Sequence, residues 1–147
     1  MVIGVVDKDK NIKILSFGCS TGEECVSLNK YLPNASILGV DINKKSLAKA
    51  KQNNSKQNIS YKYCEPNEIS NLGKFDVVIA ISVLCKHPEA IYLDDLTKIY
   101  PFERYEEMVN KLDTIVKENG LLIIRSSNYI FSDVKISNKY KSIENNN

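Results

Sequence analysis

This 147-residue chain is poor in the residue types that bind metals, form disulfides or anchor membranes. It has one histidine, four cysteines and no tryptophan. The cysteines, at positions 19, 25, 64 and 85, form no Cys-x-x-Cys pair, so we expect no metal site and reduced thiols in a cytoplasmic protein. No apolar run approaches the ~20 residues of a membrane span. The apolar N-terminus has no basic region before it and no cleavage site after it, so we do not interpret it as a signal peptide.

The chain also has little excess charge of either sign. Its 20 basic residues face 18 acidic ones, and the formal net charge is +2. Nucleic-acid-binding domains of this size more often carry a basic stripe, so the charge gives no strong signal for a nucleic-acid partner. The lack of a long apolar run leads us to expect no membrane partner. The length predicts a single domain. We expect its core over residues 1–132 and a polar, frayed tail over residues 133–147.

Apolar strands alternate with amphipathic helices along the chain. Strands are predicted at Lys13–Phe17, Ser36–Val40, Ile59–Cys64, Phe75–Ile81 and Leu121–Ile124, with further short ones possible at Val2–Val6 and Tyr140–Ile143. Helices are predicted at Glu23–Leu32, Lys44–Asn53 and Phe102–Lys117, the last closed by Asn119-Gly120. This alternation predicts a parallel sheet with helices on both faces.

A glycine loop follows the first predicted strand, with Gly18 and Gly22 four residues apart. Asp41 follows the second strand, and a right-handed strand–helix–strand unit brings both features to the carboxyl edge of the sheet. The spacing is neither that of the ATPase phosphate loop nor that of the dinucleotide fingerprint. Glu23 and Glu24 open the helix, where they would repel a pyrophosphate and favour a ligand with a positive group. A helix cap by Asp41 remains an alternative to ribose binding.

The segment ILSFGCSTG, from Ile14 to Gly22, resembles the first motif of class I S-adenosylmethionine-dependent methyltransferases. Within that superfamily, the loop CSTGEE is most similar to that of chemotaxis-receptor glutamate methyltransferases. The resemblance continues in order through GVDIN, YCEPNEI, FDVVIAISVL and KENGLLIIRSS. It covers roughly residues 13–128, most of the chain.

The resemblance implies an α/β fold, a three-layer Rossmann-like methyltransferase core. Its mostly parallel sheet would have the order 3-2-1-4-5, with the C-terminal strands reduced or absent. It implies S-adenosylmethionine as cofactor and no metal. The implied cofactor-binding residues are Gly18, Cys19, Ser20, Thr21, Gly22, Glu23, Glu24, Asp41, Ile42, Glu65, Ala80, Ile81 and Ser82.

The chain departs from the family pattern in the first strand. Ser16 stands where the family has an acid that often helps hold the methionine amino group, so Glu23 or Glu24 is expected to substitute. Pro66 removes a backbone N–H that often contacts adenine. No catalytic residue is identified, and His87, the only histidine, is a weak candidate for a base.

These observations predict methyl transfer by in-line displacement to an unidentified acceptor. The modest charge favours a small molecule, and a protein acceptor remains open, as does the oligomeric state. One alternative is a non-catalytic methyltransferase-like module that binds cofactor or a partner. Another is a nicotinamide-binding domain, which the glycine spacing disfavours.

Overall fold

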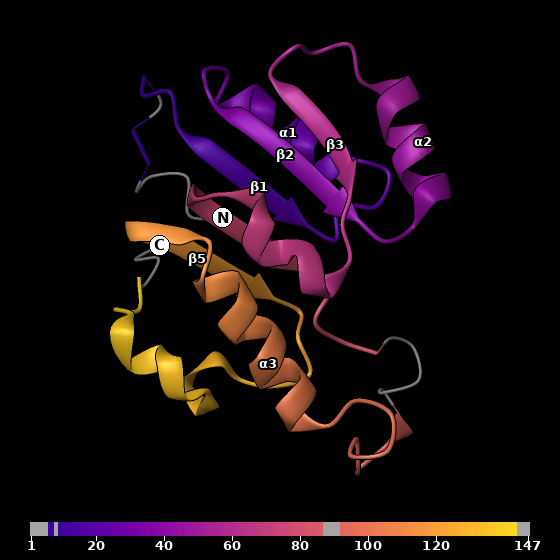
Figure 1. The fold of residues 1–147 in the computed structure, drawn as a ribbon, viewed down its shortest axis with the longest axis vertical. Coiled ribbons are helices and arrows are strands. Elements are labelled where there is room, and N and C mark those ends of the chain that lie inside the picture. Colours follow the sequence, from indigo (N-terminus) through magenta and orange to yellow (C-terminus); the bar gives the residue numbers. More distant parts are fainter. Residues whose placement is uncertain (1–5, 8, 87–91, 144–147) are drawn as a thin grey trace.

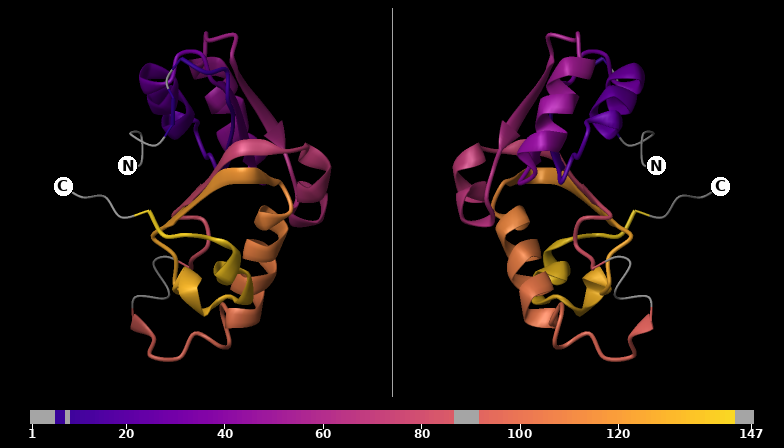
Figure 2. Two further views of the ribbon diagram at one scale, coloured as in Figure 1. Left: turned by 90° about the vertical axis from the view of Figure 1, so that its left-hand side faces the viewer. Right: turned by 90° about the vertical axis from the view of Figure 1, so that its right-hand side faces the viewer.

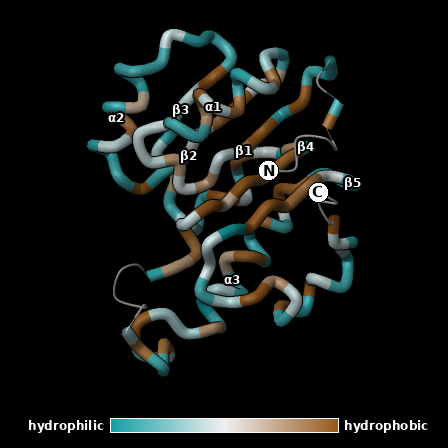
Figure 3. The backbone as a smooth tube through the Cα atoms, turned by 180° about the vertical axis from the view of Figure 1, so that it is seen from behind, coloured by the Kyte–Doolittle hydropathy of each residue, from teal (hydrophilic) through white to brown (hydrophobic). Residues whose placement is uncertain are grey.

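A computed structural model describes residues 6–7, 9–86 and 92–143. Five parallel strands form one sheet in the order β3-β2-β1-β4-β5, which confirms the predicted order (Figure 1). The strands are β1 Lys13–Phe17, β2 Ser36–Asp41, β3 Ile59–Tyr63, β4 Phe75–Ile81 and β5 Val116–Arg125. The central strands β1 and β4 consist mostly of hydrophobic residues (Figure 3).

Helices cover the two faces of the sheet (Figure 2). The helices α1 (Glu23–Tyr31) and α2 (Lys44–Asn53) pack on one face, over alternate strand residues that include Ile14 and Ile79. The helix α3 (Phe102–Asp113) packs on the other face, over the intervening residues, such as Leu15 and Val78. Both faces of the central strands are therefore apolar, as parallel strands buried on both sides require.

The first two helices begin and pack as their sequences predict. The stripe of Cys25, Leu28 and Leu32 is buried against the sheet. The Asn43 side chain caps α2 by accepting hydrogen bonds from the amides of Lys45 and Ser46, at 3.0 and 3.1 Å. Local capping chemistry thus fixes where α2 starts.

The predicted end of α3 was wrong. The helix ends at Asp113 rather than Lys117, and β5 begins at Val116 rather than Leu121. Asn119 and Gly120 lie inside β5, where the register with β4 shifts, and Asn119 adopts a φ of 60°. A Cβ on Gly120 would lie 2.8 Å from the Lys117 carbonyl oxygen, so the bulge needs glycine for close backbone packing. Pairing with β4 therefore prevails over local helix propensity here.

A short helix that the sequence reading missed follows β3. The 3-10 helix η2 spans Pro66–Leu72 and begins with a capping box between Glu65 and Glu68. The Glu65 amide donates to the Glu68 carboxylate at 2.9 Å, and the Tyr63 hydroxyl donates to Glu65 Oε1 at 2.6 Å. The pattern of proline preceded by an acid, with a second acid three residues later, is the signal that identifies such a start.

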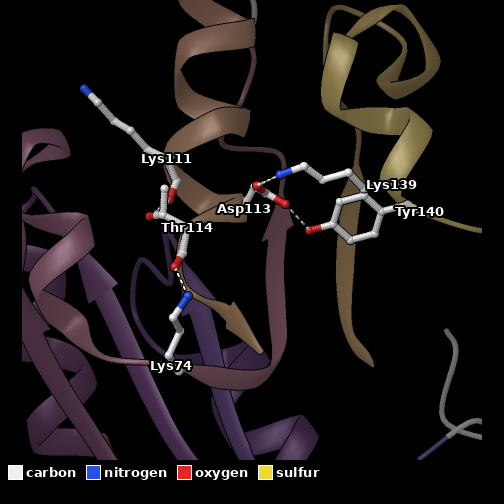
Figure 4. A network of polar contacts seen from close by, with 6 residues as sticks. All are labelled: Lys74, Lys111, Asp113, Thr114, Lys139 and Tyr140. Atoms are coloured by element: carbon white, nitrogen blue, oxygen red, sulfur yellow. Dashed lines mark hydrogen bonds and ion pairs between the residues drawn. The ribbon is translucent and has the colours of Figure 1, made fainter. Parts of the chain in front are cut away.

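We expected the tail from residue 133 onward to be frayed, but residues 131–140 are folded. They form 3-10 helices at Phe131–Asp133 and Lys135–Lys139, and Val134 is 1% exposed. Asp113 at the end of α3 accepts hydrogen bonds from Tyr140 Oη at 2.8 Å and Lys139 Nζ at 2.9 Å (Figure 4). Residues 140–143 form no strand. Buried apolar contact and one carboxylate thus hold this polar-looking segment against α3. The division of the chain at residue 132 stays a prediction.

We expect Val134→Ala to lower the free energy of unfolding by about 2 kcal/mol, because the change removes two buried methyl groups. Chemical denaturation monitored by circular dichroism measures the change. Lys135→Ala, at an exposed neighbouring position, is the control and should alter stability by less than ~0.5 kcal/mol. Equal effects of the two substitutions would contradict the docking of this segment.

Candidate cofactor site

The glycine loop between β1 and α1 lies at the carboxyl edge of the sheet. Gly18 and Gly22 adopt φ values of 74° and 83°, in the left-handed region that glycine tolerates. A Cβ on Gly18 would lie 2.4 Å from Val83, and one on Gly22 would lie 2.4 Å from the Tyr61 hydroxyl oxygen. Both positions therefore need glycine for conformation and for space. The amides of Gly18 and Cys19 donate to the Val40 carbonyl and tie the loop to β2.

Asp41, at the end of β2, lies directly against this loop. Its Oδ2 accepts a hydrogen bond from the Ser20 amide at 2.8 Å, and its Oδ1 accepts one from the Asn43 amide at 2.8 Å. The predicted juxtaposition of acid and loop is thus present in the structure. Each carboxylate oxygen thus accepts one hydrogen bond from a backbone amide and can accept a further one, because a carboxylate offers about four lone-pair sites.

Glu24 lies beside the end of β1. Its Oε1 accepts a hydrogen bond of 2.7 Å from the hydroxyl of Ser16, which is fully buried in the central strand. A carboxylate from α1 thus reaches the place where the strand itself carries only a hydroxyl. Glu23, its neighbour, is exposed. The structure therefore singles out Glu24 among the two acids considered from the sequence.

Backbone strain is concentrated at the same edge. Among the described residues, the non-glycine positions with positive φ are Ser20, Ser82, Asn119 and Ser126. Three of them are serines that follow the ends of β1, β4 and β5, with φ values of 49°, 54° and 53°. Positive φ is costly for residues with a Cβ and is often associated with functional sites. The strand ends therefore form a strained rim beside the glycine loop.

The other predicted site residues differ in their surroundings. Ile42, next to Asp41, is 65% exposed, an unusual state for a large apolar side chain. Ile81 is half-buried and Ser82 is exposed, whereas Ala80 is fully buried in the core below them. Glu65 caps η2 as described above. His87 lies outside the described residues.

Two thiols lie under the loop. Cys19 is 5% exposed and Cys25 is fully buried, and a Cβ on Gly39 would lie 2.9 and 3.0 Å from their two sulfur atoms. The interaction with the neighbouring Cys25 thiol, together with burial, raises the pKa of Cys19, and the interaction with Cys19 lowers the pKa of Cys25. Burial raises the pKa of the neighbouring Tyr61 to about 12. The loop thus rests on a closely packed cluster of two thiols and the Tyr61 ring, in which Cys19 and Tyr61 are uncharged at neutral pH.

A groove that the sequence did not predict lies beside this site, lined by Glu24 and Ile81 but by neither the glycine loop nor Asp41. Its volume is about 1540 Å³, and it extends from Glu24 and Ile81 along β5 to Ile130 and Tyr140. Arg125, at the end of β5, lines it opposite Ile81 in the strand register and is exposed. The predicted fifth strand ended at Ile124, one residue short. A strand predicted through Arg125 would have placed this residue at the carboxyl edge of the sheet.

The sheet is parallel, with the strand order β3-β2-β1-β4-β5, and Asp41 after β2 contacts the glycine loop after β1. These features define a Rossmann-like domain, a class suited to nucleoside-containing ligands. More specifically, the chain belongs to the methyltransferase domain family, whose sequence model matches residues 8–147. This finding confirms the family resemblance seen in the motifs.

Two curated relatives show similar sequences. The chain is 25% identical over 150 residues to the release factor glutamine methyltransferase of Flavobacterium psychrophilum, covering 89% of this chain and 52% of the relative. It is 26% identical over 132 residues to the ubiquinone biosynthesis O-methyltransferase of Pelagibacter ubique, covering 85% and 48%. The chain thus spans about half the length of these relatives.

Solved structures share the fold. Coclaurine N-methyltransferase, bound to N-methylheliamine and SAH, superposes with a TM-score of 0.63 at 14% identity, over 82% of this chain and 31% of that chain. PKMT2 from Rickettsia typhi, in complex with AdoHcy, superposes with a TM-score of 0.60 at 20% identity, over 78% of this chain and 20% of that chain.

None of the helices within residues 6–7, 9–86 and 92–143 has both the length and the apolar composition that a membrane span requires.

Proposed function

We propose that this domain binds S-adenosylmethionine and transfers its methyl group to an acceptor, in a protein of the methyltransferase family. The observation that carries the proposal is Asp41 lying against the glycine loop, 2.8 Å from the Ser20 amide. A carboxylate at this place can accept hydrogen bonds from ribose hydroxyls, while the bare peptides of Gly18 and Gly22 allow close approach. Relatives that include methyltransferases of proteins and of small molecules support the reaction class.

The surrounding residues fit the remaining parts of this cofactor. The exposed side chain of Ile42 would pack on the adenine ring, since an exposed apolar residue beside Asp41 gains by burial. Glu24, held by Ser16, would bind the methionine amino group. Ile81 and Ser82 would line the side of the methyl group. Of the remaining predicted positions, Cys19, Thr21 and Ala80 would contribute backbone or support, and Glu65 would lie on the adenine side. The exposed Glu23 carboxylate would make no contact of its own with the cofactor.

The cofactor supplies a methyl group already activated on a sulfonium. This chain's residues therefore need mainly to hold donor and acceptor in line, an effect worth up to ~7–11 kcal/mol in favourable cases. A base is needed only when the acceptor must lose a proton. An in-line displacement without an obligatory catalytic triad is consistent with a site built from a loop, carboxylates and strand ends.

We propose a small molecule as the acceptor, because a net charge of +2 is modest for a nucleic-acid-binding domain of this size. A protein acceptor is the second candidate, on the similarity to the release factor methyltransferase. Methylation assays with purified small molecules and with release-factor peptides separate these two. We further propose that the protein acts in the cytoplasm, in keeping with its unpaired cysteines.

A ligand titration tests the proposed function. Thermal unfolding is measured with S-adenosylmethionine, S-adenosylhomocysteine or NAD, each at about 100-fold its dissociation constant, which stabilises a binding protein by about 2.7 kcal/mol. We expect stabilisation by the two adenosyl-sulfur compounds and none by NAD. A response to NAD alone would overturn the proposal. Binding without methylation of any acceptor would favour a non-catalytic binding module.

We expect Glu24→Gln to weaken S-adenosylhomocysteine binding by roughly tenfold, since a charge-assisted hydrogen bond is worth about 1.5–3 kcal/mol. Isothermal titration calorimetry measures the affinity. Glu23→Gln is the matched control, because Glu23 is the adjacent but exposed acid, and it should leave affinity unchanged. If both variants bind as tightly as the wild type, Glu24 does not hold the amino group.

A further inference from the structure

Cys19 and Cys25 form a thiol pair that the proposed methyl transfer does not use. Cys19 belongs to the glycine loop and Cys25 to the first turns of α1. Both sulfur atoms lie over the same backbone position of β2, because a Cβ on Gly39 would be 2.9 Å from the Cys19 sulfur and 3.0 Å from the Cys25 sulfur. Gly39 thus leaves the space in which the two sulfurs meet. The other described thiols, at positions 64 and 85, are not part of this cluster.

We propose that Cys19 and Cys25 form a reversible disulfide that lowers the affinity of the glycine loop for its ligand. The effect on affinity rests on the proposed cofactor binding, whereas formation of the disulfide does not. The two cysteines are separated by only five residues, so the bond would close a small ring that contains Ser20 and Gly22. Gly22, with its φ of 83°, lies within that ring and can adopt backbone conformations that other residues cannot.

The chemistry is a two-electron oxidation by a peroxide. The Cys25 sulfur attacks one peroxide oxygen, the O–O bond breaks, and a sulfenic acid and one water result. The Cys19 sulfur then attacks the Cys25 sulfur, the S–O bond breaks, and the Cys19 proton leaves with the hydroxyl group as a second water. Two thiols are oxidised and one hydrogen peroxide is reduced to two waters. The lowered pKa of Cys25 supports its role as the first attacking group, and because Cys25 is fully buried, peroxide would reach it through local opening of the loop.

The bond would displace the loop. The two thiols are free in the structure, and an S–S bond would bring the sulfurs to ~2.05 Å, so forming the disulfide would draw Cys19 in the loop and Cys25 in α1 toward one another. Ser20, the next residue, donates its amide to Asp41 at 2.8 Å, and this contact lies at the centre of the proposed ligand site. A shift of about 1 Å in positioning groups is enough to weaken a site severely. Oxidation of the pair is therefore coupled to loss of affinity.

Mass spectrometry tests whether the disulfide forms. The protein carries Cys85→Ser, because the thiol of Cys85 is partly accessible and would otherwise react. It is treated with hydrogen peroxide, alkylated, and digested with trypsin, which releases both cysteines in one peptide, residues 14–30. A glutamate-specific protease then cuts between them, after Glu23 or Glu24. We expect the two halves to stay joined after oxidation and to separate after treatment with dithiothreitol.

Calorimetry with S-adenosylhomocysteine tests the effect on affinity in the same protein. We expect binding to weaken on the order of tenfold after oxidation and to recover with dithiothreitol. Cys25→Ser should abolish both the joined peptide and the response to peroxide, whereas Cys64→Ser should preserve both. Failure to find the joined peptide, or a joined peptide with unchanged affinity, would overturn the proposal. Loss of binding in the reduced protein would instead contradict the proposed function, and the peptide result would still decide the disulfide.

Discussion

Asp41→Ala is expected to weaken S-adenosylhomocysteine binding by at least about 30-fold, equivalent to ~2 kcal/mol. The substitution removes the carboxylate that would accept the ribose hydroxyls. It also removes the 2.8 Å hydrogen bond from the Ser20 amide, which positions the loop. Asp41→Asn retains one acceptor oxygen and loses the charge, so its affinity should fall between that of wild type and Asp41→Ala. Isothermal titration calorimetry measures all three proteins.

Asp76 offers a matched control at the opposite edge of the same sheet. Its carboxylate accepts hydrogen bonds from the Lys13 amide at 2.8 Å and from Lys117 Nζ at 2.9 Å. Burial opposes ionisation, but these two donors lower the pKa of Asp76 below its usual value. Its contribution to stability is therefore present at neutral pH and is lost as the pH falls through the folded-state pKa.

Asp76→Asn should accordingly reduce stability at neutral pH and leave ligand affinity unchanged. Circular dichroism and thermal unfolding establish that each variant is folded before its affinity is compared. If Asp41→Ala is folded and binds with wild-type affinity, or if Asp76→Asn weakens binding as much, the placement of the ribose at Asp41 is wrong.

Gly22→Ala is expected to lower the free energy of unfolding by about 2–5 kcal/mol. Left-handed backbone costs a residue with a Cβ about 1–2 kcal/mol, and overpacking adds typically 1–3 kcal/mol. The new Cβ would lie 2.4 Å from the Tyr61 hydroxyl oxygen and 2.7 Å from the ring carbon that bears it. Tyr61 is 9% exposed and donates to the Gly22 carbonyl at 3.3 Å, so it has little room to withdraw. Denaturant titration measures the loss.

Gly73 separates the two causes of this loss. It has a φ of 91°, but a Cβ there would meet nothing within 4 Å. With a ψ of −155°, Gly73 lies in a region that glycine alone readily adopts, so Gly73→Ala should cost only a conformational term, about 1–3 kcal/mol. Combining Gly22→Ala with Tyr61→Ala should cost less than the sum of the two single changes, because the clash disappears. Strict additivity in the double variant would contradict close packing of the loop against Tyr61.

Much of the architecture could be predicted because its signals are local. The apolar run of β4, the cap at Asn43 and the stripe of α1 each depend on neighbours within a few residues. The spacing of Gly18, Gly22 and Asp41 placed the loop and the acid together, because a strand–helix–strand unit has one favoured hand. The strand order followed from the family resemblance and is confirmed.

Other features could not be obtained from local patterns. The sequence predicts a helix that continues through residues 114–117, yet pairing of β5 with β4 places residues 116 and 117 in the sheet. The segment around Val134 reads as polar, but one buried side chain and the carboxylate of Asp113 hold it against α3. Each outcome depends on a partner far away in the chain.

The amino-acid sequence was sufficient to establish the class of fold, the glycine loop and its acid, since these arise from short-range periodicity, glycine conformation and the handedness of chain crossings. Tertiary structure alone decided that Glu24 rather than Glu23 meets Ser16, that Tyr61 closes on Gly22, and that the thiols of Cys19 and Cys25 meet above Gly39. Those pairings depend on how helix and strands pack, which is set by the whole core rather than by neighbouring residues.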